Sequence, residues 1–268
     1  MLRKIIAFVK KDFLVESSYR FALAFNIFGI LTSLLGYFFI DKLFGHRIVN
    51  QLEEFGVNYF SYALLSTAVF GYVGMGLSSF SERIRYEQVE GTLEAILLTP
   101  TRTATLLTSM ALWNMLLTTV NIVIYAVIGS CVFKIDFTRA DIPATLMVFF
   151  LTILSFSSLG ILSASFIMVF KRGNPVGWII GGLEGLIGGV YFPVAVLPVW
   201  LQALAQFFPI THAIRAVQLS VYKGYSIAHL GKEICFLSLF SIVLLPLSFF
   251  AFNHSIRKAR IDGSLSQY

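Results

Sequence analysis

The run IPATLMVFFLTILSFSSLGILSASFIMVF, from Ile142 to Phe170, contains no charged residue and decides the fold class of this chain. A helix rises about 1.5 Å per residue, so this run is long enough to cross the roughly 30 Å hydrocarbon core of a membrane. A charged side chain at the centre of a bilayer costs about 2.5 to 3.5 kcal/mol, so a run of this length without charge is typical of lipid surroundings. The run therefore predicts a transmembrane helix.

Four other charge-free runs have the same character. They are Phe21 to Ile40, Val57 to Phe80, Thr103 to Phe133 and Ile234 to Ile256. A sixth region contains the single formal charge of Glu184, and we expect a crossing helix there from about Val176 to Val190. Because prolines interrupt helices, the prolines that follow predict a broken outer segment over residues 191–232, which enters the membrane surface without crossing.

The composition agrees with a chain whose solvent is lipid. Of 268 residues, 57% are hydrophobic and only 13% are charged, well below the share in an ordinary soluble domain. The mean hydropathy is +0.81. Cys131 and Cys235 lie far apart in apolar runs, which excludes a disulfide scaffold. We expect an all-α integral membrane protein, with six transmembrane helices in a single domain over residues 1–268.

The distribution of positive charge sets the orientation. Most of the 20 Lys and Arg residues fall on one side of the membrane if both termini are cytoplasmic. The positive-inside rule therefore predicts cytoplasmic termini and an even number of crossings. Residues 1–18 precede the first crossing, and their apolar side chains share one helical face. This pattern predicts an amphipathic helix in the membrane interface, with the apolar face formed by Leu2, Ile5, Ile6, Val9 and Phe13.

Motifs for nucleotide binding and catalysis are absent from the sequence. The only Gly-Lys pair, Gly231-Lys232, is followed by Glu and lacks the upstream glycine of a P-loop. The four histidines are scattered singly, and none forms the HExxH motif of a zinc enzyme. Glu53 and Glu54 fall in a predicted outer loop, where we interpret them as a solvated surface pair. We expect no metal and no cofactor in this chain.

The predicted inner loop, residues 81–102, contains the run EGTLEAILLTP. On a helix, Glu87, Glu90 and Glu94 would form one acidic face, because they stand at positions i, i+3 and i+7. This face indicates either a solvated helix with local ion pairs or a surface for a protein partner. Pro100 would end the helix, since the residue before proline avoids the helical region.

The run resembles the E-G-T-x-E-x-L-x-x-T-P signature in the first cytoplasmic loop of ABC-2 type transport permeases. A second block resembles the family before the last crossing, at Tyr191-Phe192-Pro193, Leu197-Pro198, Trp200-Leu201, Phe208-Pro209-Ile210-Thr211-His212 and Arg215. The resemblance implies that the loop is a coupling helix seated in a groove of a separate ATPase. The coupling residues would be Glu87, Glu90, Gly91, Thr92, Leu93, Glu94, Thr99 and Pro100.

The resemblance also implies the partners and the activity. The chain would be the permease of an ATP-driven exporter in the plasma (inner) membrane, paired with a second copy of itself and with two ATPase subunits that hold ATP and Mg. It would move an amphipathic or lipid-like substrate outward, such as a drug, a lipid or a lipid-linked polysaccharide, and it would bind no nucleic acid. The alternatives are a passive channel, which would conduct without an ATPase, and an intramembrane enzyme, which would lose activity when one polar residue is replaced.

Glycines recur every four residues along the predicted fifth crossing, at Gly177, Gly181, Gly185 and Gly189. Such a ladder lets another helix approach closely, and Glu184 shares its face. Tight packing and a structural hydrogen bond are one interpretation. The other is a transport path or an interface between protomers, with Phe21, Phe25, Phe28, Gly177, Gly181, Glu184 and Gly188 as candidate residues. The phenylalanine stripe could equally face lipid.

The broken backbone after the fifth crossing could act as an outer gate, or it could anchor aromatic side chains at the membrane interface. The candidate gate residues are Tyr191, Phe192, Pro193, Pro198, Pro209, His212 and Arg215. A single histidine such as His212 is more typical of a hydrogen-bonded structural residue than of a proton switch.

Overall fold

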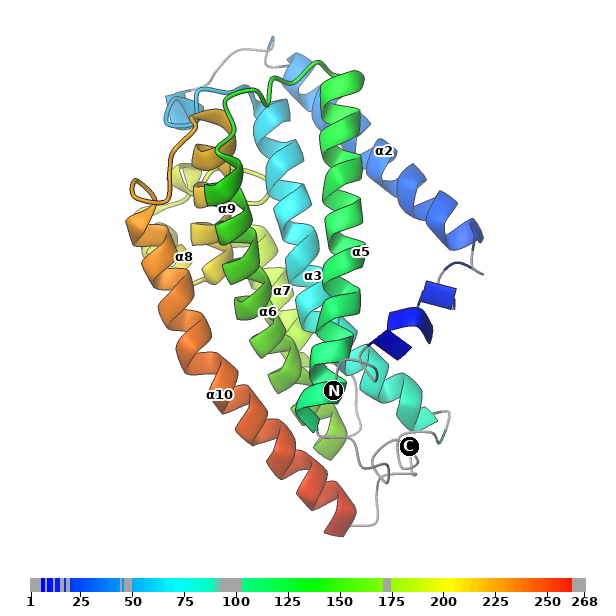
Figure 1. Cartoon of the computed structure of the whole chain (residues 1–268). Coiled ribbons are helices and arrows are strands. Elements are labelled where there is room, and N and C mark those ends of the chain that lie inside the picture. Colours follow the sequence, from blue (N-terminus) through cyan, green and yellow to red (C-terminus); the bar gives the residue numbers. More distant parts are fainter. Residues whose placement is uncertain are drawn as a thin grey trace.

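The computed structural model is a bundle of helices, several of which run its full length (Figure 1). It describes residues 6–7, 9–11, 13–14, 17, 20–43, 45, 50–89, 91, 103–170 and 175–261. In these ranges every regular element is a helix, as the sequence predicts. The long helices are α2 (Arg20–Leu43), α3 (Tyr59–Val89), α5 (Thr103–Cys131), α6 (Ile142–Phe170) and α10 (Gly231–Ile261).

The length and hydropathy of these helices make the chain a multi-pass membrane protein. Four of them contain windows long and apolar enough to cross a bilayer, at Ala24–Leu43, Tyr59–Glu87, Ile142–Phe170 and Gly231–Ala259. In α5 the apolar stretch is shorter, Met115–Cys131. The helix α7 (Pro175–Ile187) has 13 residues and is about 20 Å long, less than the roughly 30 Å of hydrocarbon. The count of six crossings therefore stays a prediction.

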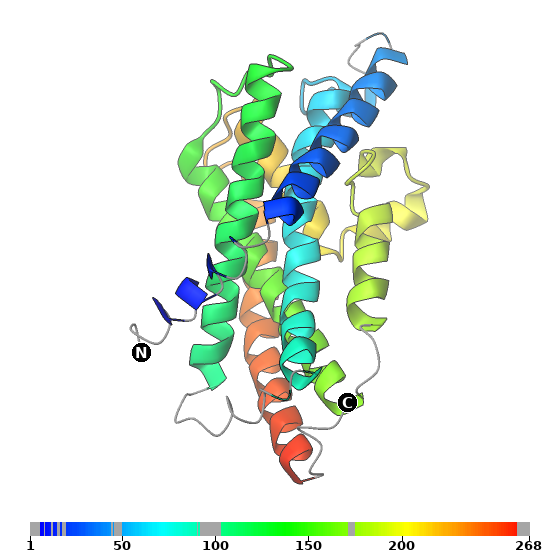
Figure 2. The same ribbon diagram turned by 90° about the vertical axis from the view of Figure 1, so that its right-hand side faces the viewer.

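The two ends of the bundle are called inner and outer, after the predicted orientation of the chain in the membrane. The inner end holds the last residues of α3, α6 and α10 and the first residues of α5 and α7 (Figure 1). The outer end holds the last residues of α2 and α5 and the first residues of α3 and α6. Figure 2 shows α7 and the segment after it on one side of the bundle, where α7 packs against α3.

The chain between α7 and α10 differs from the expected outer segment. Irregular backbone and two short helices, η2 (Val194–Val196) and α8 (Val199–Ala205), follow α7 as predicted, each of the two preceded by a proline. Residues Pro209–Tyr222, however, form one continuous helix, α9, in which every residue except Arg215 is buried. This stretch of the predicted segment is therefore an unbroken helix covered by protein, since α3, α6 and α10 pack around α9.

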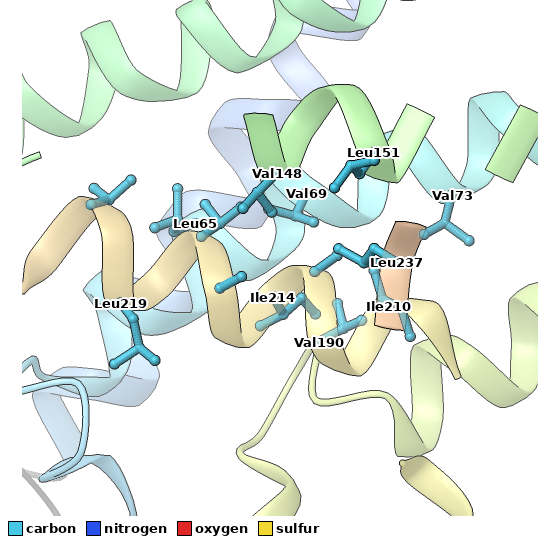
Figure 3. Packing of buried hydrophobic residues seen from close by; sticks show 14 of the residues in the cluster. Leu65, Val69, Val73, Val148, Leu151, Val190, Ile210, Ile214, Leu219 and Leu237 are labelled. Carbon is cyan, nitrogen blue, oxygen red and sulfur yellow. The ribbon is translucent and has the colours of Figure 1, made fainter. Parts of the chain in front are cut away.

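The main hydrophobic core surrounds α9 (Figure 3). Side chains of α3, α6, α9 and α10 meet there, including Val69, Val148, Ile210, Ile214 and Leu237. A second core joins α3, α5, α6 and α10 toward the inner end, around Phe80, Ile84, Leu107, Met168 and Phe252. Through these two cores α3 connects the inner end of the bundle with the outer end.

Candidate functional site

A glycine follows the end of α3 closely, within the predicted inner loop 81–102. The helix ends at Val89, and Gly91 has a φ of 68°, the left-handed conformation typical of a helix C-terminus. A helix therefore cannot run unbroken from Glu87 to Glu94, and the predicted single acidic face is wrong. The other residues predicted to couple to an ATPase lie outside the described part of the chain; they are Glu90, Thr92, Leu93, Glu94, Thr99 and Pro100.

Glu87 contacts the amino-terminal segment. Its carboxylate accepts a hydrogen bond from Lys11 Nζ at 3.3 Å, and only 4% of the residue is exposed. The ring of Phe13 in the same segment packs edge-on against Trp113 of α5, with centroids 6.4 Å apart. Glu87 therefore holds the amino-terminal segment against the last turn of α3.

The glycine ladder of α7 packs against helices of the same chain. A methyl group added at Gly181 would lie 3.5 Å from Leu77, and one at Gly185 would lie 3.0 Å from Phe70, both on α3. A methyl group at Gly188 would overlap Ile210 of α9. Close packing therefore accounts for Gly185 and for Gly188, which follows the end of α7, whereas a methyl group at Gly181 would make an ordinary contact. Gly177 continues α7 toward its first residue.

Glu184 lies within this packed region. Only 1% of the residue is exposed, and neither carboxylate oxygen has a hydrogen-bond partner among the described residues. The structural hydrogen bond that the sequence offered as one interpretation is not formed with any of them. A buried carboxyl group without a partner is costly, so Glu184 lowers the stability of the fold unless a group outside the described residues pairs with it.

The phenylalanine side chains along α2 do not lie in the buried region that contains the candidate residues of α7. Phe21, Phe25 and Phe28 are 84%, 72% and 67% exposed, whereas Glu184 is buried. The single chain therefore leaves this stripe open to lipid or to another protein, and it does not bring the proposed pathway residues together.

A cavity of about 190 Å³, here called the outer cavity, lies among the start of α3, the segment after α7, and α8 and α9. Of the candidate gate residues, Pro193 and Arg215 line it, and Tyr191 lies outside it with its ring 6.5 Å from that of Phe70. Phe192, Pro198, Pro209 and His212 do not line it. The polar residues of the lining are Gln51, Glu54, Tyr62, Gln202, Gln206, Thr211 and Arg215.

His212 has a structural role next to the outer cavity. Its Nε2 donates to the backbone carbonyl of Gln206 at 2.9 Å, and its ring stacks on Phe236 with centroids 3.9 Å apart. These contacts fix the turn between α8 and α9 to α10. They agree with the expectation of a hydrogen-bonded structural histidine.

Arg215 links three elements at the rim of the outer cavity. Its Nη2 and Nε donate to Glu54 Oε1 at 2.6 Å and 3.0 Å, and its Nη1 donates to Glu233 Oε1 at 3.0 Å. Glu54 is exposed, as the sequence predicts for a surface residue, but it is also paired, because α9 brings Arg215 against it. Sequence reasoning missed Glu233, although an acidic residue in the first turn of a helix is a recognisable signal.

Replacing Arg215 by methionine is expected to lower the free energy of unfolding by about 1 to 3 kcal/mol, since Glu233 is buried and would lose this cation. The double variant Arg215→Met with Glu233→Gln should recover most of the loss, because no charge then remains buried. The melting temperature of the detergent-purified variants measures both effects. Equal losses in the single and double variants would show that the ion pair does not stabilise this region.

Comparison with known protein families identifies the family of this chain. The model of the family described as ABC-2 type transporter matches residues 3–222. The chain belongs to this family. No curated protein sequence matches it.

The match confirms the resemblance that the loop 81–102 and the second block carry. The matched region extends from the amino-terminal segment to Tyr222, the last residue of α9, and so includes both the loop and the second block. Members of the ABC-2 family are transport permeases and not catalysts, and they work with an ATPase subunit. This permease is therefore the membrane part of an ABC transporter.

Proposed function

We propose that this permease exports an amphipathic or lipid-like substrate, driven by ATP hydrolysis on separate subunits. The family match over residues 3–222 is the observation that carries the proposal. The working unit is two copies of the chain with two ATPase subunits, which hold ATP and Mg. It lies in the plasma (inner) membrane with both termini in the cytoplasm. The exposed apolar faces of its helices, including the stripe of α2, suit a path used by greasy molecules.

The coupling loop 81–102 transmits force from the ATPase to α3. The continuity of α3 supports this route, because this helix of 31 residues contains Tyr62 of the outer cavity near its start and ends at Val89 within the loop. The inner core then links α3 to α5, α6 and α10 through packed side chains. A displacement of the loop would therefore move the bundle and not only the end of one helix.

The double variant Glu90→Lys with Glu94→Lys is expected to abolish assembly with the ATPase, because it reverses the charge of the proposed contact surface. Co-purification with the ATPase and the stimulation of its ATP turnover measure the effect. Glu87 is left unchanged, since its bond with Lys11 supports the fold. The control is Glu53→Lys, an exposed residue near the outer end.

Purified alone, the permease should hydrolyse no ATP. A charge-reversed variant that assembles normally and stimulates turnover normally would contradict the coupling assignment. Conductance of the isolated permease in a bilayer would instead indicate a channel.

A further inference from the structure

The outer cavity contains hydrogen-bonding groups that the fold does not use. Thr211 lies in its lining and is 6% exposed, yet its hydroxyl has no partner among the described residues. Buried hydroxyl groups nearly always have a partner, so an unpaired one that lines a cavity indicates a missing ligand group. Gln206 adds a carboxamide to the same lining, while its backbone carbonyl is already bonded to His212.

The charge of the cavity excludes a site for an anion. Arg215 is its only positively charged lining residue among those described, and its guanidinium is bonded to Glu54 and Glu233. Two carboxylates therefore offset one cation, and no positive charge remains for a phosphate or a carboxylate. The Gln202 carboxamide already donates to the backbone carbonyl of Leu197 at 2.8 Å. Among the described residues the Thr211 hydroxyl and the Gln206 carboxamide remain, and both groups donate and accept and so complement other hydroxyl groups.

The size of the cavity limits its occupant. A volume of about 190 Å³ is below the roughly 300 Å³ at which pockets for drug-sized molecules begin. It corresponds to the volume of about six water molecules in the liquid. A single small head group fits this space, whereas a whole amphipathic molecule does not.

The surroundings of the cavity suit a molecule with an apolar tail. In α8 and the turn after it, Gln202 and Gln206 line the cavity, whereas Val199, Trp200 and Phe207 are 81%, 69% and 74% exposed. This segment therefore lines the cavity with two glutamines and presents apolar side chains to its surroundings. A lipid could place its head group in the cavity and its acyl chains along the apolar face.

We propose that the outer cavity binds the uncharged, hydroxyl-rich head group of a glycolipid, one sugar ring in size, with Thr211 and Gln206 as hydrogen-bonding residues. The inference rests on the proposed export of lipid-like substrates and assigns them a head-group chemistry. The site lies within one chain, so it exists in each protomer whatever the oligomeric state.

Native mass spectrometry of the purified permease, in a detergent without a sugar head group, tests the proposal. The probes are three lipids with the same acyl chains: a monoglucosyl diacylglycerol, a phosphatidylglycerol and a lipid with a trimethylammonium head group. The glucosyl lipid is expected to bind with a Kd at least tenfold lower than the other two. Equal binding of the three lipids, or tighter binding of either charged one, would overturn the proposal.

Two substitutions locate the site. Thr211→Val and Gln206→Leu are each expected to raise the Kd for the glucosyl lipid about tenfold. Thr211→Val removes a hydroxyl that has no partner in the fold, so its melting temperature should not fall. The matched control is Thr152→Val, a buried threonine of α6 whose hydroxyl bonds to Val148 in its own helix. Unchanged binding by Thr211→Val would overturn the assignment.

The binding measurement is independent of the ATPase. If the glucosyl lipid binds as expected but the assembled transporter does not export it, the proposed function fails and the binding site stands. If ATP-driven export of another lipid occurs without binding of the glucosyl lipid, the site assignment fails and the proposed function stands.

Discussion

Replacing Gly160 by alanine is expected to prevent the permease from folding into a monodisperse protein in detergent. The backbones of α3 and α6 are in contact at this residue, where an added methyl group would overlap the carbonyl oxygen of Gly76. A methyl group at Gly76 would in turn lie 2.6 Å from Phe156 Cβ. Overpacking a core typically costs about 1 to 3 kcal/mol when side chains can adjust. The cost should be larger here, because the neighbour is backbone of another helix.

Size-exclusion chromatography and the melting temperature of the solubilised protein measure this effect. The matched control is Gly71→Ala on α3, where an added methyl group has no heavy atom within 4 Å. Alanine favours a helix over glycine by about 1 kcal/mol, so this control should be at least as stable as the parent. A Gly160→Ala protein with the parent's melting temperature would show that the two helices are not in contact there.

Replacing Glu184 by lysine is expected to have the second large effect, a loss of several kcal/mol in the free energy of unfolding. A charge at a position that is 1% exposed and offers no partner among the described residues carries the full cost of losing water. Glu184→Gln keeps the size of the side chain without a charge, and its stability should lie within about 1 kcal/mol of the parent. Glu184→Leu should be more stable than either, because it removes unpaired polar atoms from the interior.

Thermal unfolding of the three variants in the same detergent ranks them directly. The expected order of melting temperature is leucine above glutamine above lysine. If the lysine variant were as stable as the glutamine variant, Glu184 would have to be in contact with water or with an anionic group.

The sequence predicted where the long helices lie because each one contains a long uncharged run, although charged residues extend α3 and α10 beyond the predicted runs. The predicted crossing Ile142 to Phe170 has the bounds of α6, and the predicted run Thr103 to Phe133 ends two residues after α5. The predicted helix Val176 to Val190 ends at Ile187 in the structure, where the chain turns and Gly189 takes a φ of 89°. Composition alone does not fix the residue at which a helix ends.

The sites were less predictable, because their residues meet from distant parts of the chain. Arg215 was a predicted gate residue, but its partners Glu54 and Glu233 lie in a loop and in another helix. The spacing of Glu87, Glu90 and Glu94 predicts one helix, although Gly91 lies between them in a left-handed conformation that ends a helix. Its family resemblance still identified the loop, since a motif can be recognised without its backbone geometry.

The amino-acid order by itself determined that the chain is helical, that lipid is its solvent and that it belongs among permeases, because hydropathy and short motifs are local properties. Only the tertiary structure decided that α9 is buried. That helix contains His212, Arg215 and Gln218, which suggest a polar surface segment, and it becomes core only because α3, α6 and α10 enclose it. The outer cavity also exists only in the tertiary structure, because its walls come from four separate segments of the chain.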